Sequence, residues 1–199
     1  ENGEVTTTNI NLQERQKLDF LKYEGPTDPV YTGSLGNIFS YKNFHLNIFM
    51  TYSFGNVLRL DPVFKSAYND LSSMTKVFKN RWMRGGDELI TNVPTIIDRY
   101  KYRKTSNVDR VYSAYNLSSV RVAKGDFIRM KEISLAYDFP KTWFSNTPIN
   151  NLSVKLQATN LFLLYADSKL NGQDPEFFNT GGVASPMPKQ FTLTVKVGL

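Results

Sequence analysis

Few side chains in this sequence have the types and the spacing that enzyme chemistry requires. Histidine occurs once, as His45, and cysteine does not occur. The lack of cysteine excludes disulfides, thiol nucleophiles and cysteine-ligated metal sites. The Gly-x-Ser-x-Gly turn that carries the nucleophile of many serine hydrolases is also absent. We therefore expect His45 to be a solvated residue beside a turn, and neither a metal ligand nor a catalytic group.

Two pairs of carboxylates stand close together in the sequence. Glycosidases use two carboxylates ~5–9.5 Å apart across a cleft. The pairs here lie in Gly86-Asp87-Glu88 and Asp174-Pro175-Glu176, stretches whose Gly and Pro favour loops. We expect these acids to organise loops. The sequence thus predicts no catalytic residue, no bound metal and no cofactor, and we do not expect an enzyme.

The charge of the chain is the next constraint on its partners. Lys and Arg number 24 against 18 Asp and Glu, which gives a net charge of +6. One basic cluster is interleaved with Tyr100 and Tyr102, and it contains Arg99, Lys101, Arg103, Lys104 and Arg110. Such interleaving can bind single-stranded nucleic acid, but no nucleic-acid motif frames it. We expect a solvated loop here and no nucleic-acid partner.

The elements that must position these residues are strands. A strand is expected at 189–199, where residues 191–199 alternate without a break between apolar and polar or small residues. Residues 31–41 and 44–56 also alternate, and Lys42-Asn43 between them suits a two-residue hairpin turn, because Asn tolerates positive φ. This turn would place Tyr41 opposite Phe44. The apolar residues Leu46, Ile48, Met50, Tyr52 and Phe54 would then continue the face of Phe44, and Phe49 would be an exception on the other face.

Two more strands are expected at about 125–139 and 151–164. In the first, Ile133 and Leu135 share a face but Ile128 and Met130 fall on the other, which indicates a bulge near Lys131-Glu132 or an upper half that stands clear of a membrane. The connections alternate in length, because 42–43 and 140–150 are short whereas 57–124 and 165–188 are long. Short turns at one end and long loops at the other are typical of outer-membrane barrels. Residues 68–82 are a candidate helix within the first long connection.

These patterns predict an all-β fold, an antiparallel transmembrane β-barrel with long external loops. Strand 44–56 would span ~43 Å at ~3.3 Å per residue, enough to cross the apolar band when tilted. The mean hydropathy is −0.36, and no apolar run approaches the ~18 residues of a membrane helix. The face expected to contact lipid comprises Phe44, Leu46, Ile48, Met50, Leu152, Val154, Leu156, Phe191, Leu193, Val195 and Val197. Residues 1–30 would be an external loop and the approach to the first of the strands in 31–199.

A secreted, soluble β-sandwich that binds carbohydrate is the alternative. It would use the same alternation, but it would bury the apolar face against a second sheet. It explains poorly the long strand and the segregation of long loops to one end. A passive porin is a third possibility, which differs from an active importer in that uptake would not need energy.

Several stretches resemble one family, the SusC/RagA-type TonB-dependent outer-membrane transporters of Bacteroidetes. The stretches follow one another in the order and spacing of the C-terminal part of such a transporter, from Asp28 almost to the end of the chain. They are 28–34 (DPVYTGS), 39–44, 52–56 (YSFGN), 80–82 (NRW), 86–88, 125–140 (GDFIRMKEISLAYDFP), 158–162 (ATNLF), 174–176 and 186–189 (PMPK).

The resemblance implies the last five or so strands of a closed barrel of about 22 strands with a plugged lumen. It implies import of glycan fragments or peptides across the outer membrane, a SusD-like surface lipoprotein that caps the barrel, and energy supplied by TonB through an N-terminal segment upstream of Glu1. Leu199 stands where such barrels often end in Phe, the residue that the insertion machinery reads. Candidate cargo contacts on the external side are Trp82, Tyr100, Tyr102, Phe177 and Phe178.

Overall fold

The structure is a computed structural model, and it describes residues 21–63, 75–95, 108–178 and 186–199. The chain divides into two compact units, one formed by Glu1–Glu24 and Arg59–Ala123, the other by Gly25–Leu58 and Lys124–Leu199. Within the described ranges, no helix is long and apolar enough to cross a bilayer. Tyr100, Tyr102 and the basic residues at 99–104 lie outside the described residues, as does the 68–74 part of the candidate helix.

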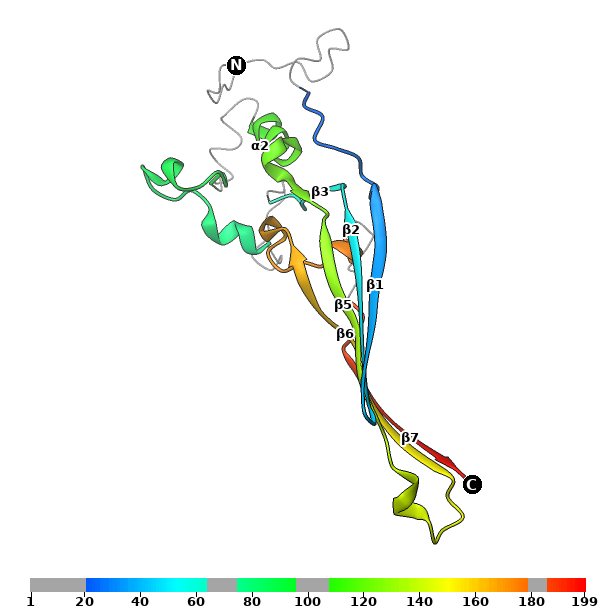
Figure 1. The fold of residues 1–199 in the computed structure, drawn as a ribbon. Helices are drawn as coiled ribbons and strands as arrows, with labels where there is room; N and C mark the ends of the chain where they lie inside the picture. The colour runs from blue at the N-terminus through cyan, green and yellow to red at the C-terminus, as the bar shows by residue number, and fades with distance from the viewer. Residues whose placement is uncertain (1–20, 64–74, 96–107, 179–185) are drawn as a thin grey trace. The chain divides into compact units, whose positions relative to one another are not determined.

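The second unit is built on one antiparallel sheet of five strands in the order β1-β2-β5-β6-β7. The strands are β1 Tyr31–Tyr41, β2 Phe44–Phe54, β5 Phe127–Asp138, β6 Asn151–Ala166 and β7 Gln190–Gly198. Both short connections, β1 to β2 and β5 to β6, lie at one end of the sheet, and the long connections leave from the other (Figure 1). The observed antiparallel sheet agrees with the all-β architecture that the alternation predicted.

The first hairpin has the register that the sequence predicts. Tyr41 pairs with Phe44 and Phe39 with Leu46 across the Lys42-Asn43 turn. The turn residue with positive φ is Lys42, at 52°, and not the Asn43 that the sequence suggested. Farther along the hairpin, Gly33 lies opposite Tyr52, and a Cβ there would meet the phenol oxygen at 2.5 Å. The glycine therefore makes room for the tyrosine ring.

A bulge at Lys131 in β5 restores the alternation of that strand. Phe49 of β2 pairs with Glu132, but the next residue, Met50, pairs with Met130, so Lys131 has no partner on β2. One extra residue reverses the parity of side chains on either side of it. Ile128 and Met130 therefore join the face of Ile133, and the first of the two interpretations offered by the sequence is confirmed.

The second expected strand, 44–56, is shorter than expected. β2 ends at Phe54 and not at residue 56, since Gly55 takes φ 90° and donates its N–H to Asp126 Oδ1 at 2.7 Å. The chain then forms β3, Val57–Arg59, which makes a separate two-stranded sheet with β4, Val122–Lys124. Both of these short strands lie in the stretch 57–124, which was expected to be a loop.

The first unit carries the α-helix α2, Val108–Leu117, and the 3-10 turns η1 Lys76–Asn80, η2 Asp87–Leu89 and η3 Ser119–Arg121. The part of the 68–82 candidate helix that the structure describes is only the single turn η1. Tyr112 of α2, Val63 and Val93 are buried in this unit, and the hydroxyl of Tyr112 donates to the carbonyl of Thr95 at 2.5 Å. Burial raises the pKa of this phenol.

Candidate functional site

The sheet of the second unit has one apolar face that runs across all five strands. The register aligns side chains of the same face in rows perpendicular to the strands. One row is Tyr41, Phe44, Tyr137, Val154 and Val195. The next is Phe39, Leu46, Leu135, Leu156 and Leu193. All eleven residues named above as lipid contacts have the parity of this face.

Much of this apolar face is open in the part of the chain that the structure describes, although Met130 is buried. Leu156, Leu193 and Phe191 are 57%, 64% and 77% exposed, and Val195 and Val197 are also exposed. A single exposed apolar residue is ordinary on a protein surface, but a continuous apolar face marks contact with a partner or a membrane. A soluble sandwich would bury this face against a second sheet, so that alternative is not favoured.

The opposite face is mostly polar, with Ile38 and Phe49 as exceptions, and it carries charged side chains that are paired with one another. Glu132 of β5 accepts a hydrogen bond from Asn47 Nδ2 at 3.3 Å and lies 3.8 Å from Lys155 Nζ of β6. Asn47 and Lys155 belong to the strands on either side of β5. The polar face thus adds cross-strand contacts to the backbone ladder, and its side chains suit a wet surface.

His45 has two partners on the polar face. Its Nδ1 lies 2.9 Å from Ser40 Oγ, and its Nε2 lies 3.1 Å from Asp138 Oδ2. A hydroxyl, an imidazole and a carboxylate in series could serve a hydrolase. Here, however, Ser40 is simply the residue opposite His45 in the hairpin, and the side chains of His45 and Asp138 are 40% and 60% exposed. The expectation of a merely solvated histidine missed these contacts, which tie β1, β2 and the end of β5 together.

The most buried charges of the second unit join the β6–β7 connection to the polar face. We call Arg129, Lys131, Asp174 and Glu176 the Arg129 cluster. Arg129 of β5 donates from Nη2 to Asp174 Oδ1, and its Nε lies 2.9 Å from Glu176 Oε2, an ionic contact. Lys131 Nζ lies 3.5 Å from Glu176 Oε1. Asp174 also accepts the backbone N–H of Glu176 at 3.1 Å, which caps the 3-10 turn η6, Pro175–Phe177.

The Arg129 cluster therefore holds residues 167–178 over the polar face. A second contact supports this placement, because Asp167 Oδ2 accepts the N–H of Lys124 at 2.8 Å. Leu170 is buried within the same connection. Asp174 and Glu176 bind an arginine and a lysine, which agrees with the expectation that this acidic pair organises a loop. No signal in the sequence pointed to Arg129 as their partner.

The candidate aromatic contacts are distributed over both units. Phe177 and Phe178 are half-buried and follow directly after the residues that bind Arg129. Trp82 belongs to the first unit, where its indole Nε1 donates to Glu88 Oε2 at 2.9 Å. Within the described residues, no group of three or more His, Asp or Glu side chains is placed to hold a metal ion.

The sequence has relatives among curated proteins. It is 27% identical over 160 residues to TonB-dependent receptor P39 of Formosa agariphila, a match that covers 78% of this chain and 14% of the relative. It is 26% identical over 175 residues to TonB-dependent receptor P3 of the same organism, covering 88% of this chain and 14% of the relative.

This chain is similar in sequence to TonB-dependent receptors. This similarity agrees with the resemblance stated from the motifs. No protein-family model matches the sequence. The chain spans 14% of the length of each curated relative, so it corresponds to one part of a receptor. The relatives are named as receptors and not as enzymes.

Solved structures show the same fold. The RagAB peptide importer in the 'open-open' state superposes with a TM-score of 0.64 at 21% identity, over 89% of this chain and 18% of that chain. Its 'closed-closed' state gives a TM-score of 0.60 at 24% identity, over 88% of this chain and 18% of that chain. The fold of this chain is thus similar to that of one part of the RagAB structure.

Proposed function

We propose that this chain forms part of the barrel wall of a TonB-dependent importer in the outer membrane. The apolar face of the five strands contacts lipid, and the polar face lines the lumen. The observation that carries this proposal is the apolar face itself, which is continuous from β1 to β7 and exposed at Leu156, Leu193 and Phe191. Backbone groups at the free edges of β1 and β7 then pair with other strands of the closed barrel, since lipid offers them no partner.

The work of this part of the protein is mechanical. The long connections leave from the end of the sheet that faces the outside, and the β6–β7 connection folds over the lumen face through the Arg129 cluster. Phe177 and Phe178 adjoin that cluster and are positioned to contact cargo as it enters the lumen. Trp82 offers a ring from the other long connection. None of these steps makes or breaks a covalent bond.

The cargo we propose is a peptide or a glycan fragment, and the partners are a SusD-like surface lipoprotein and TonB. The similar structures are of a peptide importer, which favours peptide. A lipoprotein that caps the barrel would meet the long connections, whereas TonB would bind an N-terminal segment of the whole protein. Energy from TonB separates this function from that of a passive porin.

Paired cysteine substitutions in the whole protein test the orientation of the sheet. Leu193→Cys and Thr194→Cys are neighbours on β7 with opposite side-chain directions, and this stretch has no native cysteine. A hydrophilic maleimide should label the Thr194→Cys variant in cells and leave the Leu193→Cys variant unlabelled. Equal labelling of both, with the product recovered without detergent, would contradict the barrel. Cargo uptake that survives collapse of the proton-motive force would instead indicate a passive porin.

A further inference from the structure

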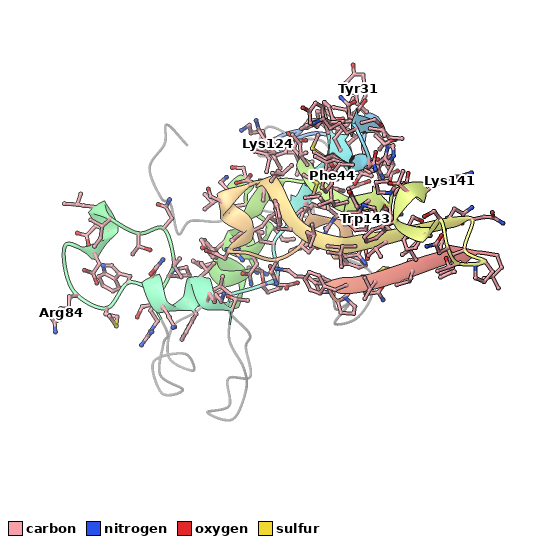
Figure 2. The ribbon with its side chains drawn as sticks, turned by 60° about the horizontal axis from the view of Figure 1, so that its bottom comes forward. Tyr31, Phe44, Arg84, Lys124, Lys141 and Trp143 are labelled. Carbon is pink, nitrogen blue, oxygen red and sulfur yellow. The ribbon has the colours of Figure 1, made fainter. Side chains whose placement is uncertain are left out.

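A cluster of aromatic and basic residues lies at the end of the sheet that bears the short connections. We call it the interfacial cluster, and it comprises Tyr41, Lys42, Phe44, Tyr137, Phe139, Lys141 and Trp143. Four of its rings, those of Phe44, Tyr137, Phe139 and Trp143, form one contiguous chain of contacts. Phe44 and Tyr137 have centroids 4.6 Å apart, Tyr137 and Phe139 4.9 Å, and Phe139 and Trp143 5.6 Å. Figure 2 labels Phe44, Lys141 and Trp143 of this cluster.

Two rings of the cluster, those of Tyr41 and Trp143, are large, amphipathic and open to the surroundings. Tyr41 is 72% exposed and Trp143 is 65% exposed. Tyr41, Phe44 and Tyr137 share the parity of the apolar face and form its last full row at this end. Tyrosine and tryptophan at such a position occupy the boundary between hydrocarbon and headgroups, where the ring is apolar and its polar atom is wet.

The cluster contains two lysines and no carboxylate side chain, so its net charge is positive. Lys42 holds its ammonium 5.4 Å from the centroid of the Tyr41 ring, and Lys141 is exposed at the start of the 3-10 turn η4, Lys141–Phe144. Residues 139–150 contain no Asp or Glu. The nearest carboxylate in the sequence, that of Asp138, binds His45 on the opposite face.

We propose that the interfacial cluster binds the phosphate of an anionic phospholipid in the periplasmic leaflet. Lys42 and Lys141 pair with the phosphate, while the rings of Tyr41 and Trp143 lie against the glycerol and the first carbons of the acyl chains. The inference rests on the proposed barrel, because it places this end of the sheet at a membrane surface. The inference adds an anionic ligand in the periplasmic leaflet, because in the proposed barrel the short connections face the periplasm.

The test uses the whole transporter, purified in detergent and exchanged into nanodiscs that contain phosphatidylglycerol or only phosphatidylcholine. Co-purified and retained phosphatidylglycerol is counted by native mass spectrometry. Each lysine near an anionic surface contributes about a fivefold change in affinity, so the Lys42→Asn, Lys141→Gln double variant should bind phosphatidylglycerol roughly 30-fold more weakly. Asn is chosen at residue 42 because it tolerates the positive φ of that turn.

Two controls keep the result interpretable. The Lys189→Gln variant removes an exposed lysine just before β7, at the end of this strand that is far from the interfacial cluster. It should leave the number of bound lipids unchanged. The Lys42→Arg, Lys141→Arg variant keeps both charges and should retain the lipid. Equal retention by the double variant and by Lys189→Gln would overturn the proposal. So would a double variant that loses lipid A phosphate and keeps phosphatidylglycerol, because the cluster would then face the outer leaflet.

Failure of this inference can be told apart from failure of the proposed function. If the cysteine pair on β7 reports a barrel and the double variant still retains phosphatidylglycerol, only the lipid site is wrong. If the cysteine pair reports no barrel, both proposals are wrong.

Discussion

Arg129 on β5 and Asp174 in the β6–β7 connection form an ion pair whose side chains are only 7% and 8% exposed. Such burial removes both charges from water, and each compensates the other. Glu176 contributes a second carboxylate to the same guanidinium. Arg129, near the start of β5, is therefore the main buried anchor of residues 167–178, to which the contacts of Lys131 and Lys124 add.

Replacing Arg129 with Ala should release this connection. The change leaves Asp174 buried without a counter-charge, and we expect a loss of about 3–5 kcal/mol in the stability of this part of the protein. Hydrogen exchange of residues 167–178 in the whole transporter should increase strongly. The matched control is Lys131→Ala, whose half-exposed contact with Glu176 should be worth less than about 1 kcal/mol. Equal protection of the segment in both variants would contradict the role given to Arg129.

The apolar face makes a second prediction, at Val195 in β7. If this side chain lies near the midplane of the membrane, Val195→Arg should destabilise the barrel, lowering its free energy of unfolding by roughly 2–4 kcal/mol. Thr194→Arg places the same charge on the opposite face and should cost much less. Reversible unfolding of the whole barrel in lipid vesicles measures both values. A Val195→Arg variant as stable as Thr194→Arg would argue against lipid contact at this row.

Much of the sheet was predictable because its information is local. The period of two in each strand fixed which residues share a face, and the two-residue turn then fixed the pairing of Tyr41 with Phe44. The break in parity between Met130 and Ile133 likewise indicated an extra residue, which is Lys131. In each case, a few neighbouring residues were sufficient to define the geometry.

Contacts between distant residues could not be predicted in the same way. Arg129 and Asp174 are far apart in the sequence, and neither belongs to a motif that requires the other. The bulge in β6 was also missed, because Asn160, with φ 54°, precedes an apolar run at 161–164 that obscures the alternation. Helix α2 was missed although Val108, Val111, Tyr112 and Tyr115 lie at the i, i+3, i+4, i+7 spacing of an amphipathic helix. The candidate cargo residues were chosen for their ring chemistry alone.

We expect the stability of the loop that carries Trp82 to depend on pH. Asp87 Oδ2 accepts the backbone N–H groups of Met83 and Arg84, both at 2.9 Å, and these bonds lower the pKa of Asp87 below its ordinary value of 3.8. A lowered folded pKa means that the stabilising effect is complete above about pH 3.8 and is lost as the pH falls through the folded value. Hydrogen-exchange protection of residues 82–91 should therefore drop only below that pH.

The Asp87→Asn variant separates this titration from general acid denaturation. It removes the carboxylate, so its loop should be less protected at neutral pH and should show no further transition near the folded pKa of Asp87. Protection of the five-stranded sheet serves as the internal reference. If the variant and the native loop lose protection at the same pH, another group controls the transition.

Deletion of Lys131 is the sharpest test of the bulge. Without this residue, the side chains of β5 before the bulge reverse direction, so that Ile128 and Met130 turn toward the polar face and Arg129 turns toward lipid. A charge on the lipid face and the loss of the Arg129 cluster should together prevent folding of the barrel in the membrane. Lys131→Ala removes the same side chain but keeps the backbone, and it should fold almost normally. The measurement is the protease-resistant fraction of the whole protein in isolated outer membranes. A deletion variant as resistant as Lys131→Ala would mean that the register can shift freely along β5, and the two-faced sheet would lose its physical basis.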